Sequence, residues 1–213
     1  MRKKELAKAA VEKLKQQYPD AACSLRAANA FELLVATRLS AQCTDARVNL
    51  VTPKLFERFP TPHAFAAVTP AEVEPYIRSC GLYKTKARDL VALSQMLLER
   101  FDGQVPGTLE ELVSLPGVGR KTANLICGDV FGIPGCVVTD THCIRIANRL
   151  GLCNTTDPRR VETALRALLP AEESNAFCHR LVLFGREFCQ ARSPQCSACP
   201  LADICKQNKQ RGL

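Results

Sequence analysis

Four cysteines fall within the seventeen residues 189–205 of this 213-residue chain, and no other feature of the sequence constrains its fold as strongly. They are spaced C-x6-C-x2-C-x5-C, at Cys189, Cys196, Cys199 and Cys205. Four soft thiolates on one short loop can surround one soft metal centre, either an iron–sulfur cluster or a tetrahedral zinc ion. Zinc sites favour two tight cysteine pairs, whereas only one pair is tight here, so the spacing favours the larger cluster. Disulfide bonds are the remaining alternative.

The N-terminal segment lacks the apolar core of a signal peptide, because charged residues interrupt it from Arg2 to Lys15. We therefore expect a cytosolic protein, and in that reducing compartment metal binding is favoured over disulfides. The other eight cysteines are scattered singly and are expected to be packing residues. A mean hydropathy of −0.06 indicates an ordinary globular chain with no need of a membrane.

The rest of the chain is expected to be helical, because apolar residues recur at spacings of three and four and no stretch alternates long enough for a sheet. Two helix starts have the spacing of a capping box, at Thr69 with Glu72 and at Thr108 with Glu111. Helices are expected at 3–18, 29–39, 44–59, 84–101, 141–150, 158–169 and 174–188, the third interrupted at Pro53. The first should bury Leu6, Ala10, Leu14 and Tyr18.

Residues 115–121 read LPGVGRK and predict a tight turn between two helices. Gly117 and Gly119 remove side chains from the turn, so an anion can approach the backbone N–H groups at a helix start. The basic pair Arg120 and Lys121 follows at once, in a chain whose 29 basic and 21 acidic residues give a formal net charge of +8. A phosphate is the natural ligand, and a simple helical corner is the alternative.

Together these segments resemble the bacterial endonuclease III family, which comprises DNA glycosylases with lyase activity of the helix-hairpin-helix superfamily. The likeness runs through nearly the whole chain. It rests on LSAQCTD at 39–45, GLY at 81–83, LPGVGRK at 115–121, VTDTH at 138–142 and the four-cysteine loop 189–205.

The resemblance implies an all-α fold of two helical domains with a DNA-binding cleft between them. One domain would be a six-helix barrel at 22–132, containing a helix-hairpin-helix motif at about 108–131. The other would join 1–21 to 133–213 and hold a [4Fe–4S] cluster in loop 189–205. The implied ligands are Cys189, Cys196, Cys199 and Cys205.

The activity implied by the resemblance is that of a bifunctional DNA glycosylase and apurinic/apyrimidinic lyase, which removes oxidised pyrimidines from duplex DNA in base excision repair. A stacked base must be flipped out of the duplex before any side chain can reach its sugar. Gln42 would then insert opposite the orphaned base, and Leu82 would wedge into the stack. An ordinary core position is the alternative for Leu82.

Lys121 would be the nucleophile of that family. Its amine, near the positive end of a helix and partly buried, would attack the sugar C1′ and form a Schiff base from which β-elimination cuts the strand. Asp140, at the start of the next helix, would stay ionised as a cap and accept the proton of Lys121. DNA phosphates would be contacted by Gly117, Gly119, Arg120 and Arg192.

Two other functions are compatible with parts of the pattern. An adenine-removing mismatch glycosylase shares the hairpin and the cysteine loop but lacks the lysine at position 121. A non-catalytic DNA-binding or redox-sensing module would not need Lys121 together with Asp140. The expected partner is duplex DNA with oxidised pyrimidines or abasic sites, and the expected state is a monomer in the bacterial cytoplasm, at the nucleoid.

Overall fold

The computed structural model describes residues 2–210, and these residues are helical with no strand. Contacts within the chain divide it into two compact units. The hairpin unit is Cys23–Phe131, and the cysteine-loop unit joins Met1–Ala22 to Gly132–Leu213. None of the helices within residues 2–210 has both the length and the apolar character needed to cross a membrane.

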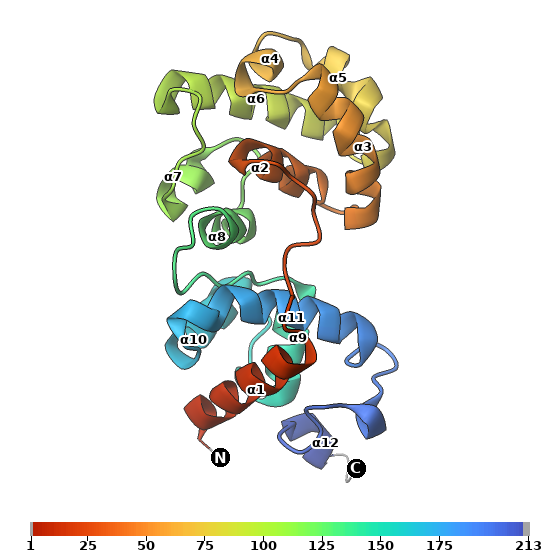
Figure 1. Cartoon of the computed structure of the whole chain (residues 1–213), viewed down its shortest axis with the longest axis vertical. Helices are drawn as coiled ribbons and strands as arrows, with labels where there is room; N and C mark the ends of the chain where they lie inside the picture. Colours follow the sequence, from red (N-terminus) through yellow and green to blue (C-terminus); the bar gives the residue numbers. More distant parts are fainter. Residues whose placement is uncertain (1, 211–213) are drawn as a thin grey trace. The chain divides into compact units, whose positions relative to one another are not determined.

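The hairpin unit is built around one long helix, α6 (Tyr83–Phe101), along which α4 and α5 pack (Figure 1). Helix α2 contacts α3, α6 and α8, so it lies in the middle of the unit. The remaining elements are α2 (Ala30–Leu39), α3 (Asp45–Arg58), α4 (Pro62–Ala66), α5 (Pro70–Ile77), η1 (Arg78–Cys80), α7 (Leu109–Ser114) and α8 (Arg120–Asp129). The unit has seven α-helices, one more than the resemblance implies, because the five-residue α4 is included.

Local hydrogen bonds explain where several of these helices begin. The Asn29 side chain accepts from the N–H of Glu32 at the start of α2, and Thr69 with Glu72 forms the predicted capping box of α5. At α7 the Thr108 hydroxyl accepts from the Glu111 N–H. The Glu111 carboxylate accepts a hydrogen bond from the Thr108 hydroxyl rather than from the Thr108 backbone N–H, so that predicted box is only half formed.

The predicted interruption of the third helix is wrong. Helix α3 runs without a break from Asp45 to Arg58 with Pro53 inside it. Proline removes one backbone donor from the helix. The packing of its buried side chains nevertheless keeps the backbone of α3 helical. These side chains are Val48, Thr52 and Leu55.

The cysteine-loop unit is a second helical bundle in which α11 packs against α1 and α9. Its elements are α1 (Lys3–Gln17), α9 (Thr141–Leu150), α10 (Pro158–Leu168), η2 (Ala171–Glu173), α11 (Ser174–Glu187), η3 (Cys196–Ala198) and α12 (Lys206–Gln210). The sequence did not predict α12. The buried face of α1 also differs from the predicted one and consists of Ala7, Ala10, Val11 and Leu14. Leu6 and Tyr18 are only half-buried, and the Tyr18 hydroxyl donates to Glu187 at 2.6 Å.

Candidate functional site

The hairpin between α7 and α8 depends on glycine for two reasons at Gly117. Its φ of +73° lies in the left-handed region that other residues rarely adopt. A Cβ placed there would also lie 2.5 Å from Arg38 Nε and 2.8 Å from Asp89 Oδ2. Gly119 has φ −91° and caps α8 with no side chain of its own, which leaves the helix N-terminus accessible to an anion.

The basic pair stands directly behind this turn, as the sequence predicts. Arg120 is the first residue of α8 and is half-buried, while Lys121 is the second residue and is exposed. The partial burial predicted for Lys121 is therefore not observed. An exposed amine in the first turn of a helix is open to a ligand approaching the hairpin.

Two exposed residues of the hairpin unit have strained backbones. Among residues 2–210, positive φ outside glycine occurs at Gln42, Leu82 and Asp102. Asp102 ends α6, where a left-handed residue is common. Gln42 (φ +54°) and Leu82 (φ +47°) are the two predicted insertion residues, and Leu82 is 56% exposed. Its exposure excludes the alternative of a core leucine. Strain of this kind costs about 1–3 kcal/mol per residue and concentrates at functional sites.

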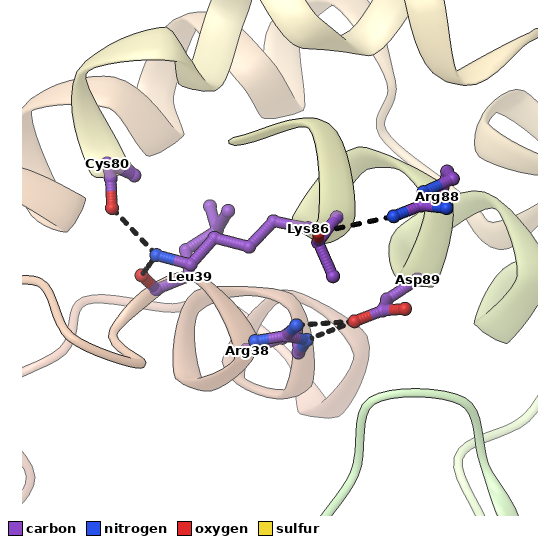
Figure 2. A network of polar contacts seen from close by, with 7 residues as sticks. Arg38, Leu39, Cys80, Lys86, Arg88 and Asp89 are labelled. Carbon is purple, nitrogen blue, oxygen red and sulfur yellow. Dashed lines mark hydrogen bonds and ion pairs between the residues drawn. The ribbon is translucent and has the colours of Figure 1, made fainter. Parts of the chain in front are cut away.

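A polar network inside the hairpin unit joins the segments that carry these residues (Figure 2). Lys86 of α6 is completely buried, and its ammonium donates to the carbonyl oxygens of Leu39 at 2.8 Å and Cys80 at 2.7 Å. One turn further along α6, Asp89 accepts from Arg38 Nε at 2.8 Å. This network was not predicted from the sequence, although a lysine on the apolar stripe of a helix is a signal of a buried polar contact.

Asp140 has the cap position predicted for it. It precedes α9 in extended conformation, is half-buried, and its Oδ1 accepts from the Cys143 N–H at 2.7 Å. The bond fixes one carboxylate oxygen and leaves the other oxygen for a second partner. Asp140 belongs to the cysteine-loop unit and Lys121 to the hairpin unit.

The four cysteines of loop 189–205 all line one cavity of the cysteine-loop unit. Apolar side chains from α9 and α11 form much of the remaining wall, including Ile146, Leu150, Phe184 and Phe188. The sulfurs also receive hydrogen bonds: Arg149 donates to Cys189 Sγ at 3.3 Å, and the Leu201 N–H donates to Cys199 Sγ at 3.4 Å. Within residues 2–210 no three Cys, His, Asp or Glu side chains converge closely enough to hold one metal ion.

The environment of these sulfurs fits an iron–sulfur group. Burial raises the pKa of the Cys199 thiol to about 11, and the three neighbouring cysteines act in the same direction. A cationic metal centre would deprotonate such thiols, and N–H donors to sulfur are typical neighbours of a cluster. Arg192, the one basic residue between Cys189 and Cys196, is exposed.

Arg149 of α9 also holds the loop backbone. Its guanidinium donates to the carbonyl oxygens of Gln190 at 2.7 Å and Ala191 at 2.8 Å. Arg145, one turn earlier on α9, donates to the carbonyl of Cys189 at 3.1 Å. The helix that Asp140 caps therefore also fixes the start of the cysteine loop.

The all-helical fold, the glycine hairpin followed by a lysine and the four-cysteine loop agree with the helix-hairpin-helix class that the sequence resembles. Comparison with known proteins supports this. Residues 35–171 match the family described as "HhH-GPD superfamily base excision DNA repair protein". Residues 189–205 match the "Iron-sulfur binding domain of endonuclease III".

Whole-chain relatives lead to the same class. Endonuclease III of Bacillus subtilis (strain 168) is 45% identical over 202 residues, which cover 94% of this chain and 92% of that protein. Endonuclease III of Escherichia coli (strain K12) is 39% identical over 194 residues, covering 91% and 92%. The solved structure "Structure of a Trapped Endonuclease III-DNA Covalent Intermediate: Estranged-Adenine Complex" matches with a TM-score of 0.93 at 45% identity, covering 100% of both chains.

The chain belongs to the HhH-GPD superfamily of base excision DNA repair proteins and, within it, to the endonuclease III family. It is a DNA glycosylase with an iron–sulfur binding loop at 189–205.

Proposed function

We propose that the protein removes oxidised pyrimidines from duplex DNA and then cleaves the strand at the abasic site as a lyase. The observation that carries the lyase step is the exposed Lys121 in the first turn of α8, directly behind the glycine hairpin. A solved relative of 45% identity is titled as a trapped covalent intermediate with DNA, which is the kind of species that a nucleophilic lysine forms.

Damage recognition begins with extrusion of the damaged nucleotide, because its sugar C1′ cannot be reached inside the stack. In the proposal Gln42 then fills the space opposite the orphaned base and Leu82 separates the neighbouring base pairs. An amide can hydrogen-bond the widowed base, and an exposed leucine can replace lost stacking area. Arg120, Gly117 and Gly119 would bind phosphate at the start of α8, and Arg192 would contact a phosphate from the cysteine loop.

Bond breaking is assigned to two residues. Lys121 attacks C1′ as a neutral amine, the C1′–N bond to the base breaks, and the base leaves as an anion that takes up a proton from solvent. The Asp140 carboxylate accepts the proton that the lysine loses and faces the positive charge that develops on the sugar. Cleavage of the C1′–O4′ bond then opens the sugar ring, O4′ takes the proton held by Asp140, and the C1′–N bond to Lys121 becomes a protonated Schiff base. The Schiff base acidifies the C2′ proton, and loss of that proton expels the 3′ phosphate by β-elimination.

Cys189, Cys196, Cys199 and Cys205 would hold a [4Fe–4S] cluster, which would supply a cross-link for the loop that carries Arg192. The excision and elimination steps move no net electrons, so they draw on protein side chains alone. Iron and acid-labile sulfide in the purified protein, with visible absorbance, would support the cluster over zinc. We further propose that the protein is a monomer and that it acts on nucleoid DNA in the bacterial cytoplasm. The net charge of +8 supports salt-sensitive binding to phosphates.

The deciding experiment is borohydride trapping on a duplex that contains thymine glycol. We expect the wild-type protein to form a covalent complex and Lys121→Ala to form none while keeping its fold. Lys54→Ala, a change of an exposed lysine on α3, serves as the matched control and should trap normally. A wild-type protein that excises the base without ever being trapped would refute the lyase proposal.

A further inference from the structure

Lys86 is unusual because its charged group is buried and bonded only to backbone carbonyls in the contacts that the structure records. The residue is 0% exposed on α6, and its ammonium reaches the carbonyls of Leu39 and Cys80 (Figure 2). Burial lowers its pKa, while the Cys43 and Cys80 thiols act in the opposite direction. A buried ammonium is costly for a protein, and a hydrophobic side chain of similar size would often be tolerated as well or better.

The two acceptor carbonyls occupy corresponding positions in the fold. Leu39 is the last residue of α2, and Cys80 is the last residue of η1. The final carbonyls of a helix lack partners within the helix and carry partial negative charge, so they are good acceptors for an ammonium. One side chain thus satisfies the ends of two helical segments that are far apart in sequence.

Each of these ends leads directly into a strained residue. Gln42 lies three residues after Leu39, in a turn closed by the bond from the Cys43 N–H to the Ser40 carbonyl at 3.0 Å. Leu82 lies two residues after Cys80, and its own carbonyl accepts from the Lys86 N–H at 3.0 Å. Left-handed conformations at non-glycine residues persist only when the surroundings enforce them.

The same face of α6 also contacts the hairpin. Asp89, three residues after Lys86, is ion-paired with Arg38 of α2, and this pair lies against Gly117. Lys86 and Asp89 therefore tie the start of the Gln42 turn, the start of the Leu82 turn and the hairpin to one helix.

We infer that Lys86 is a positioning residue that fixes the relative positions of Gln42 and Leu82, so that both enter the duplex together when a damaged base is extruded. The inference rests on the proposed function and assigns Lys86 no contact with DNA. Its role is to fix the roots of the two insertion turns relative to each other.

Lys86→Met tests this role because methionine fills similar space without a donor. We expect the variant to fold and to load its cluster. On a fully paired thymine-glycol duplex, single-turnover base excision should slow on the order of a hundredfold, the effect of misplacing a reacting group by about 1 Å. Strand cleavage at a preformed abasic site, where no base has to be unstacked, should fall clearly less. Leu97→Ala, a buried change further along α6, controls for lost stability and should leave excision near wild type at a temperature where it is folded.

A double-mutant cycle separates positioning from a general structural role. In a Gln42→Ala, Leu82→Ala background the insertion side chains are already gone, so Lys86→Met should cost little further activity. An equal cost in both backgrounds, or wild-type excision by Lys86→Met, would overturn the inference. If Lys86→Met does not fold, Lys86→Gln is measured in the same cycle with the same criteria. Failure of wild-type trapping would instead refute the proposed function, so the two failures are distinguishable.

Discussion

The hairpin unit holds its functional turns with one buried side chain, whereas the cysteine-loop unit holds loop 189–205 with arginines from a neighbouring helix. The turns around Gln42 and Leu82 are short and start from helices that are already packed, so two bonds from Lys86 fix them. Loop 189–205 contains one three-residue helical turn and buries few side chains of its own. A short turn therefore takes its shape from the packed helices beside it, but a long loop needs bonds from side chains outside the loop.

The largest effect is expected from removing one of the four cysteines proposed as cluster ligands. Cys199→Ala should lose iron and visible absorbance and destabilise the cysteine-loop unit by more than about 4 kcal/mol, the range seen when a bound metal is lost. Hydrogen exchange should show lost protection at Leu201 and Ile204, with α6 unchanged. Cys136→Ala, a buried cysteine of the same unit outside the loop, should keep its iron. Unchanged iron content in Cys199→Ala would show that the loop needs no such cross-link.

A smaller effect is expected from removing the hydrogen bonds that Arg149 donates to loop 189–205. Arg149→Met leaves the carbonyls of Gln190 and Ala191 without their donor, which should cost about 1–3 kcal/mol. We expect faster iron release under chelator challenge, followed by absorbance. Arg159→Met, an exposed arginine on α10, should release iron at the wild-type rate. Equal rates for the two variants would mean that the ligands alone hold the loop.

Two substitutions of Asp140 separate its role as the cap of α9 from its proposed catalytic role. Asparagine is as good a helix cap as aspartate, so Asp140→Asn should keep the melting temperature and lose most excision activity. Asp140→Ala should lose the same activity and about 1 kcal/mol of stability as well. Thermal melts and single-turnover excision give the two readouts. Full activity in Asp140→Asn would reduce the residue to a cap.

The smallest effect concerns Glu173 of η2, which forms ion pairs with Lys15 of α1 and Arg180 of α11. Hydrogen bonds from Lys15 and Arg180 hold the pKa of Glu173 below its usual range. Its stabilising contribution is therefore complete above the ordinary carboxyl pKa of about 4.3 and disappears as the pH falls through the lowered value. Lys15 is half exposed, so we expect Lys15→Gln to cost less than about 1 kcal/mol at pH 7. Urea titrations should show the difference from wild type shrinking below pH 4, and a difference that grew with acid would contradict this assignment.

Much of the fold could be read from the sequence because helix starts are local. The caps at Asn29, Asp140 and Asp157 each involve a hydrogen bond across three residues, so a short stretch of sequence contains both partners. The four cysteines are likewise a local pattern, and they line one cavity as their spacing suggests. The catalytic roles of Lys121 and Asp140 remain predictions from the family resemblance.

Pro53 illustrates what local reasoning could not decide. The residue argues for a break, but burial of side chains on either side of it keeps α3 continuous, and that burial depends on elements distant in sequence. The strained backbones of Gln42 and Leu82 are a second case, since neither residue type signals a left-handed conformation.

By itself the sequence determined the helical class, the caps, the hairpin and the cysteine loop, because each rests on neighbours along the chain. The tertiary structure alone decided which residues hold these parts in place. Lys86 bonds to a carbonyl 47 residues away, and backbone carbonyls carry no sequence signature. An ammonium finds such partners only after packing has brought two helix ends to the same buried point.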